Sequence, residues 1–156
     1  VAQDVTTENN DSQQLEPMLE ECTEVNGEPP AALLADAGYW SDANARLEDD
    51  QTELFIATTK DWKRQQELAE QDSPRGRIPD SYGPTELMER KLRTKRGRAI
   101  YRQRSQSVEP VFGQHVNRGL DRFMLRGEEG AAAEWSLFSA THNLLKLWRT
   151  RWDSAA

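Results

Sequence analysis

The stretch Leu33-Leu34-Ala35-Asp36-Ala37-Gly38-Tyr39-Trp40 decides the fold class of this chain. The short apolar run 31–35 follows two prolines and predicts a buried strand. Asp36 stands at the carboxyl end of that strand, where ligands bind in open α/β sheets, and the small residues after it leave room for a metal or a phosphate. Asp36 is therefore a candidate ligand-binding residue, although an aspartate at a strand end is also a common turn residue.

The segments around this strand alternate between strand and helix patterns. Residues 1–6 are short and β-prone, and an amphipathic helix is indicated by apolar residues at spacings of three and four, namely Leu15, Met18, Leu19 and Cys22. Ser41 and Asp42 open a second helix that runs to about Leu47, and residues 54–58 form a further strand. This order predicts an α/β fold with at least partly parallel strand pairing.

The rest of the chain is predicted to be mostly helical. Residues 59–84 are polar and rich in turn residues, which indicates an insertion or a long loop. Thr85 is predicted to cap a basic helix, and a long helix is predicted from Glu128 to about Trp148. The predicted divisions are thus a core part (1–58), a polar insertion or loop (59–84) and a helical part (85–156).

The net charge of −7 hides an asymmetry along the chain. Residues 1–80 carry 19 acidic and 6 basic side chains, whereas residues 81–156 carry 8 acidic and 14 basic ones, most of them between Arg90 and Arg126. The local field steers a charged partner, so the acidic average does not exclude nucleic acid. The alternative is that the basic run is a solvated helix face.

Composition argues against several classes of protein. No apolar run approaches the roughly 18 residues that span a bilayer, and no secretory signal pattern opens the chain. Cys22 is the only cysteine, so an intrachain disulfide is impossible and a reducing compartment fits. Neither His115 nor His142 has a second His or Cys at ligand spacing, so we expect His142 to be a packed or capping residue.

A second acid stands out by its context. Glu109 lies among apolar neighbours, downstream of a dense run of arginines and lysines. An acid in that setting is costly unless a cation or metal pairs with it, and the nearby bases suggest that a polyanion approaches. Pro110 fits best in the first turn of a helix, which places Glu109 near the helix N-terminus, where a carboxylate is favoured in any case.

Two motifs together resemble the Asp-Asp-Glu transposases of bacterial insertion sequences. The first is Ala35-Asp36-Ala37-Gly38-Tyr39, and the second is Tyr101-Arg102-Gln103-Arg104 followed by Val108-Glu109-Pro110-Val111-Phe112-Gly113-Gln114. Residues 5–19, 118–127 and 141–147 resemble the same family, so the resemblance covers nearly the whole chain. It implies a truncated ribonuclease H-like α/β fold, with a mixed sheet remnant followed by a helical C-terminal region.

The resemblance also implies a chemistry. Asp36 would be the second catalytic aspartate and Glu109 the catalytic glutamate, and together they would bind Mg²⁺ or Mn²⁺ through hard carboxylate oxygens. Two such ions would activate the attacking oxygen and stabilise the leaving 3′ oxygen. The reactions would be nicking at the transposon ends and attack of the freed 3′-OH on target DNA.

The same resemblance implies the partners. Tyr101 and Arg104 would contact a DNA phosphate near the scissile bond, and Arg98, Arg102 and Arg118 would follow the DNA backbone with salt-dependent affinity. Double-stranded DNA and further copies of the chain would form the active complex. A bacterial cytoplasmic protein, associated with the nucleoid when bound to DNA and not with a membrane, is expected.

The chain also departs from the family pattern. It begins in what reads as a strand already under way, and Asp4 does not stand in the context of the family's first aspartate. The lysine that usually follows the glutamate by about two helical turns is absent, with Arg118 as a candidate substitute, and Arg104 precedes Glu109 by five residues rather than four. We therefore expect a C-terminal fragment that is inactive alone. The alternatives are a non-catalytic DNA-binding or assembly module from a decayed copy, and a helical protein-interaction domain.

Overall fold

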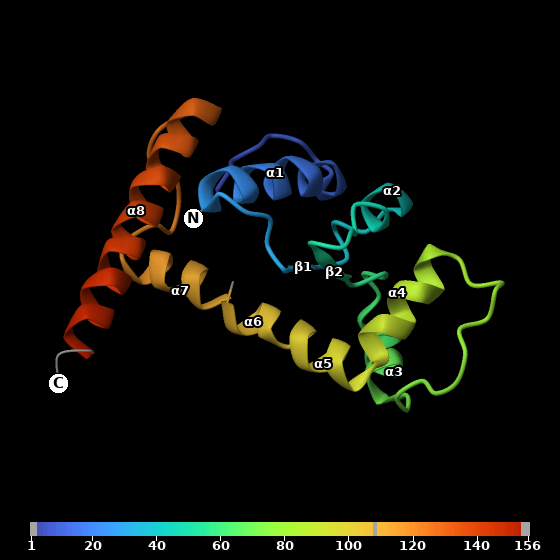
Figure 1. The fold of residues 1–156 in the computed structure, drawn as a ribbon. Coiled ribbons are helices and arrows are strands. Elements are labelled where there is room, and N and C mark those ends of the chain that lie inside the picture. Colours follow the sequence, from blue (N-terminus) through green and yellow to red (C-terminus); the bar gives the residue numbers. More distant parts are fainter. Residues whose placement is uncertain (1–2, 108, 154–156) are drawn as a thin grey trace. The chain divides into compact units, whose positions relative to one another are not determined.

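The computed structural model describes residues 3–107 and 109–153 (Figure 1). The chain forms two compact units, one made of residues 9–104 and the other of residues 1–8 together with 105–156. The first unit contains the strands, and the second consists mainly of helices.

The sheet of the first unit has two parallel strands, β1 (Ala32–Ala35) and β2 (Glu53–Ile56). Ala32 pairs with Glu53 and Ala35 pairs with Ile56, so both strands end at the same edge. The predicted parallel pairing is confirmed. The described residues contain no antiparallel strand, so the mixed sheet that the resemblance implied is not observed in them.

Strand β2 is the centre of the core. Leu54, Phe55 and Ile56 are each 0% exposed, so this strand is buried on both faces, as is typical of a parallel sheet. Leu54 and Ile56 pack with Leu15 and Met88 in one cluster. Full burial of one such side chain contributes about 1.5–3 kcal/mol.

The opposite face of β2 is covered by basic side chains. The Lys91 Nζ lies 4.5 Å from the centroid of the Phe55 ring, and the Lys91 ammonium also pairs with Glu48 at 2.5 Å. The Arg96 guanidinium binds the Glu53 carboxylate, with Nη1 at 2.7 Å from Oε1. The apolar stems of these long side chains thus shield the face while their charged ends stay paired.

The helix before β1 contains the four apolar residues whose spacing predicted it. A short 3-10 helix, η1 (Asp11–Gln14), leads into α1 (Leu15–Asn26), and Asn10 caps η1 by accepting the Ser12 N–H at 3.2 Å. Gly27 ends α1 in the left-handed conformation, with φ of 77°. The predicted helix from the 3 and 4 spacing is therefore confirmed.

Helix α2 (Asp42–Ala45) is shorter than predicted. Ser41 caps it by accepting the Asn44 N–H at 3.0 Å, as expected. The N–H groups of Arg46 and Leu47 then bond to carbonyls three residues back, which tightens the last turn and ends the helix.

Three further predictions about the elements are wrong in whole or part. Residues 3–6 form no strand, because no neighbouring strand supplies a hydrogen-bonded partner; residues 1 and 2 lie outside the described residues. The polar segment 59–84 contains helix α3 (Trp62–Glu70), which Asp61 caps through the Lys63 N–H at 3.0 Å. The third wrong prediction concerns the residue at which the next helix begins.

Helix α4 (Pro84–Arg93) begins one residue before the predicted cap, Thr85. Gly83 is the N-cap residue, and its N–H donates to the Glu86 carboxylate at 3.0 Å. Proline is favoured at the first helical position because its missing N–H and fixed φ cost nothing there. Thr85 therefore lies inside the helix.

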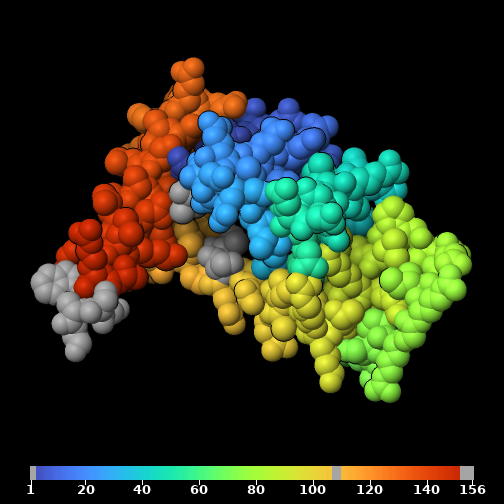
Figure 2. Space-filling view, viewed as in Figure 1, coloured from blue at the N-terminus to red at the C-terminus, as the bar shows by residue number. Residues whose placement is uncertain are grey.

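A tight corner joins α4 to α5 (Lys95–Tyr101), which α6 (Gln103–Ser107) follows. Thr94 makes the corner by accepting the Gly97 N–H at 2.9 Å and donating to the Lys91 carbonyl at 2.7 Å. A Cβ on Gly97 would lie 2.0 Å from the Lys91 carbonyl oxygen, so only glycine fits. The side chains of α4 and α5, green-yellow to yellow, are visible on the face shown in Figure 2.

The second unit packs α7 (Glu109–Asn117) against α8 (Glu128–Asp153). Pro110 lies in the first turn of α7, as predicted, and α8 continues beyond the predicted end at Trp148. No helix among the described residues is long and apolar enough to cross a membrane.

Stacked rings form the contact between α7 and α8. His115 and His142 are 2% and 5% exposed, and their ring centroids lie 5.5 Å apart at an interplanar angle of 17°. Trp135 also stacks on His115, with the two ring centroids 5.0 Å apart. The expectation that His142 is a packed residue is confirmed.

The pH dependence of stability should report this contact. Burial lowers the pKa of His142, and the nearby positive charges of Lys146, Arg118 and Arg149 lower it further, as does His115. The unfolded chain takes up this proton as the pH falls through about 6.5, whereas the folded chain resists it. Stability from this site is therefore complete above that pH and is lost as the pH falls through the lower folded pKa.

We expect urea unfolding followed by circular dichroism to show lower stability at pH 5.5 than at pH 8. His142→Phe keeps the ring stack and cannot be protonated, so its stability should change less over the same range. An equal loss in both proteins would contradict this role of His142.

Candidate active site

Asp36 follows β1 directly and begins a turn. Its Oδ1 accepts the Gly38 N–H at 2.8 Å, and its carbonyl accepts the Tyr39 N–H at 3.2 Å. This is an Asx-turn, in which the side chain holds its own loop. The position at the carboxyl end of the strand agrees with the prediction, and the turn role applies at the same time.

A second carboxylate lies beside Asp36. A Cβ built on Gly38 would be 2.6 Å from Asp11 Oδ2 and 2.9 Å from Asp36 Oδ1, so these two oxygens are no more than about 5.5 Å apart. Burial raises the pKa of Tyr39, and the negative charges of Asp11 and Asp36 raise it further. Asp11, the first residue of η1, therefore shares the site with Asp36.

Asn44 connects the segments that carry the two acids. It is 6% exposed, and its Nδ2 donates at 2.7 Å both to the Ser12 carbonyl of η1 and to the Tyr39 carbonyl of the turn. One buried amide thus satisfies two carbonyls from segments distant in the sequence. Asp11 and Asn44 were not predicted as site residues, because each reads locally as an ordinary residue at a helix start.

Tyr101 links α5 to the same strand end. Its hydroxyl donates to the Ala35 carbonyl at 3.3 Å. Burial raises the pKa of Tyr101; the Arg104 charge lowers it and the Asp36 charge raises it. The Arg104 guanidinium lies 5.8 Å from the centre of the Tyr101 ring. Three of the sequence-predicted site residues, Asp36, Tyr101 and Arg104, are therefore brought together.

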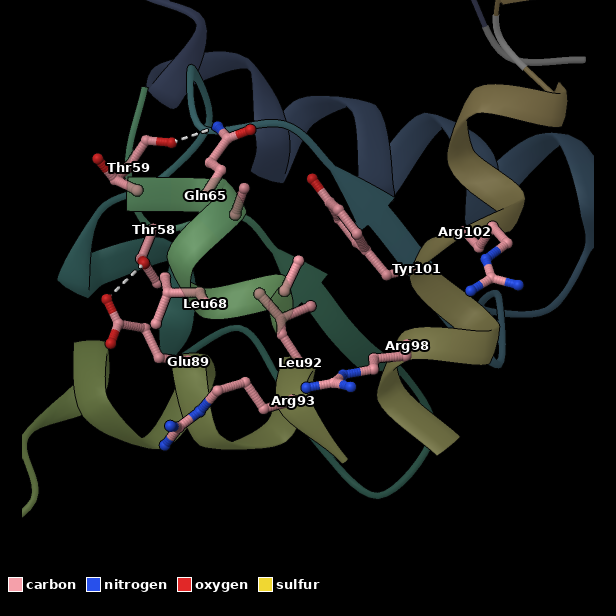
Figure 3. Close-up of a pocket in the computed structure, with 12 residues that line it drawn as sticks. Thr58, Thr59, Gln65, Leu68, Glu89, Leu92, Arg93, Arg98, Tyr101 and Arg102 are labelled. Carbon is pink, nitrogen blue, oxygen red and sulfur yellow. Dashed lines mark hydrogen bonds between the residues drawn. The ribbon is translucent and has the colours of Figure 1, made fainter. Parts of the chain in front are cut away.

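Arg98 and Arg102 line a cavity next to this strand end (Figure 3). The cavity has a volume of about 390 Å³ and lies where β2 ends, between α3, α4 and α5. Tyr101 forms part of its wall, so the cavity and the Asp36 turn share this side chain.

Glu109 and Arg118 belong to the other unit. Glu109 is the first residue of α7, as predicted, and its side chain lies outside the described part of the chain. Arg118 follows α7, and its Nη1 is buried without a hydrogen-bond partner.

The residues present match part of a metal site. Carboxylate oxygens are the ligands that Mg²⁺ and Mn²⁺ prefer, and Asp11 and Asp36 place two of them close together. Among the side chains that the structure describes, which do not include that of Glu109, no group of three His, Cys, Asp or Glu is arranged to hold a metal ion.

Comparison with known proteins bears on the helical part of the chain. Residues 77–148 match a family model described as a transposase DDE domain. The match confirms the predicted resemblance to the DDE transposases for these residues, which are less than half of the chain, and outside them the resemblance stays a prediction. The match includes Tyr101, Arg104 and Glu109, whereas Asp36 lies before it. Transposases of this family act on DNA, and their DDE domains generally use divalent metal ions.

No curated protein matches the chain, and no solved structure does. The α/β class with a small parallel sheet is therefore established from the structure itself, and the ribonuclease H-like form stays a prediction from the resemblance to DDE transposases.

Loss of the Asn44 amide should destabilise the site. Asn44→Ala leaves the Ser12 and Tyr39 carbonyls without their donor, and we expect it to lower the free energy of unfolding by about 1–3 kcal/mol. Asn26→Ala is the matched control, since it removes an exposed amide that bonds only the Cys22 carbonyl at 2.8 Å. Urea denaturation measures the free energy of unfolding of both variants. An equal decrease in Asn44→Ala and Asn26→Ala would reject the role of Asn44.

Proposed function

We propose that this chain is the C-terminal part of a transposase that cleaves DNA and transfers strands during transposition of an insertion sequence. The observation that carries the proposal is the group at the end of β1. Tyr101 binds the Ala35 carbonyl there, Arg104 lies next to the Tyr101 ring, and the charge of Asp36 raises the pKa of Tyr101. The family match over residues 77–148 supports the same function.

Asp36 and Glu109 are the proposed ligands of Mg²⁺ or Mn²⁺. Such ions would polarise the scissile phosphate and lower the pKa of the water or 3′-hydroxyl group that attacks it. Asp36 is oriented for this role by the Gly38 N–H, and the neighbouring charge of Asp11 strengthens the attraction for a cation. Glu109 is proposed from its motif and from its place at the start of α7.

The basic side chains are proposed to position the DNA. Arg104 would neutralise a phosphate close to Asp36, with Tyr101 as its neighbour, because guanidinium groups bind phosphate through charge-assisted hydrogen bonds. Arg98, Arg102 and Arg118 would contact other backbone phosphates. Double-stranded DNA at the bacterial nucleoid is the proposed partner, and the active complex is proposed to contain more than one copy of the protein.

The 156-residue chain is proposed to be inactive alone. It supplies Asp36 and Glu109, but no acid in it stands in the context of the family's first aspartate. The second candidate is a non-catalytic DNA-binding or assembly module from a decayed copy, which the absence of the family's lysine after Glu109 favours. The two candidates differ in whether Asp36 binds a metal.

Metal binding tests the proposal without requiring activity. Asp36→Asn should weaken Mn²⁺ binding at least about tenfold, measured as free Mn²⁺ by electron paramagnetic resonance, because it removes a charged ligand. Asp42→Asn, at the start of α2, removes the same charge outside the site and should change it little. Equal affinities in Asp36→Asn and the unchanged chain would leave the non-catalytic module as the function. Nicking of duplex DNA by the 156-residue chain would overturn its proposed inactivity.

Salt dependence tests the DNA contacts. If Arg102 contacts one phosphate, Arg102→Gln should reduce the slope of log affinity against log salt concentration by about 0.9 for a duplex. Lys60→Gln removes an equal charge from an exposed position outside the basic helices. Fluorescence anisotropy with a labelled duplex measures both slopes. A chain that shows no salt-sensitive affinity for DNA would instead be a protein-interaction domain.

A further inference from the structure

The cavity at the end of β2 has an apolar side. It lies wholly within the unit of residues 9–104, and its volume of about 390 Å³ is in the range of small-molecule sites. Leu68 of α3, Leu92 of α4 and the Tyr101 ring contribute to its walls, together with Ala57 at the end of β2 (Figure 3). These surfaces suit a flat, weakly polar group.

Gln71 constrains the guanidinium groups of two arginines that line the cavity, Arg93 and Arg98. Arg93 donates to the Gln71 side-chain oxygen, and Arg98 donates to the Gln71 carbonyl at the end of α3. The Nε atoms of both arginines are buried and have no hydrogen-bond partner in the structure. Buried donors without a partner carry a desolvation cost that a bound acceptor would remove. Guanidinium groups held in this way are suited to phosphate.

The charge balance of the cavity also favours an anion. Three arginines line it, Arg93, Arg98 and Arg102, against one acid, Glu89. The Glu89 carboxylate accepts the Thr58 hydroxyl at 3.2 Å and pairs with Arg64 at 3.5 Å. The negative charge of Glu89 is therefore partly balanced by Arg64, which does not line the cavity.

We propose that this cavity binds a nucleoside phosphate, with the phosphate on Arg93 and Arg98 and the base against Leu68, Leu92 and the Tyr101 ring. Inorganic phosphate would satisfy the arginines and leave the apolar side unfilled. A nucleoside without phosphate would leave the guanidinium donors unpaired. Base–aromatic contacts are tolerant of base identity, so a broad preference is expected.

Two sources share this ligand chemistry. Tyr101 lines the cavity and also binds the carbonyl that precedes Asp36, so a DNA strand that passes Asp36 would bring an unpaired nucleotide to the cavity. That source rests on the proposed function. A free mononucleotide is the other source and does not depend on it.

Calorimetric titration of the 156-residue chain compares the ligands directly. The probes are dAMP, deoxyadenosine, inorganic phosphate and a five-nucleotide single strand. We expect dAMP to bind at least about tenfold more tightly than deoxyadenosine or phosphate, because each of these lacks one half of the contacts. Equal affinity for dAMP and deoxyadenosine would overturn the proposal. Tighter binding of the strand than of dAMP assigns the cavity to a DNA nucleotide, and equal binding assigns it to a free one.

Matched variants locate the site. Arg98→Gln should weaken dAMP binding about tenfold or more, whereas Lys95→Gln, which removes the same charge from an exposed position on α5, should change it less than about twofold. Leu68→Trp fills the cavity without altering its charge and should also abolish dAMP binding. If Arg98→Gln does not fold, Arg93→Gln replaces it. Equal effects of Arg98→Gln and Lys95→Gln, or unchanged binding in Leu68→Trp, would reject the site.

Duplex binding separates this inference from the proposed function. If dAMP does not bind while the chain keeps a salt-dependent affinity for duplex DNA, the nucleotide site is wrong and the transposase proposal stands. If dAMP binds and duplex DNA does not, the transposase proposal fails and the site stands with a free nucleotide as its ligand.

Discussion

The parallel pairing of β1 with the fully buried β2 is the interaction on which the first unit depends. Leu54, Phe55 and Ile56 lose all contact with water, and burial of apolar side chains is the dominant favourable contribution to folding. Because the strands are parallel and in register from Ala32 to Ala35, both end at one edge. The Asp36 turn and the arginine-lined cavity are consequences of that shared edge.

Side chains from distant segments complete this edge, and they do so through backbone groups. Asn44 binds two carbonyls and so fixes η1 next to the turn, while Tyr101 binds the carbonyl that ends β1. The Ser12 and Tyr39 carbonyls gain a donor from Asn44, and the Ala35 carbonyl, which accepts the Ala57 N–H at 3.3 Å, gains a second donor from Tyr101. The same hydrogen bonds that satisfy them bring Asp11 and Arg104 towards Asp36, so stability and the proposed chemistry depend on the same contacts.

Local sequence patterns predicted most of the helices and strands. They failed where contacts with other segments determine whether an element forms. The helix over residues 15–26 and its end at Gly27 follow from apolar spacing and a left-handed glycine, both properties of the segment itself. Residues 3–6 have strand-like composition but no partner strand in the structure. Helix α3 was missed because its residues are almost all polar, and only the Asp61 cap indicated its start.

The sequence by itself determined the α/β class, the place of Asp36 at a strand end and the motif that joins Tyr101, Arg104 and Glu109 to the DDE transposases. These features depend on the order of residues that are close together in the sequence. Only the tertiary structure brought Asp11 beside Asp36 and gathered the arginines of α4 and α5 around one cavity. Such proximities join residues tens of positions apart, and packing of the buried core, rather than any local pattern, decides them.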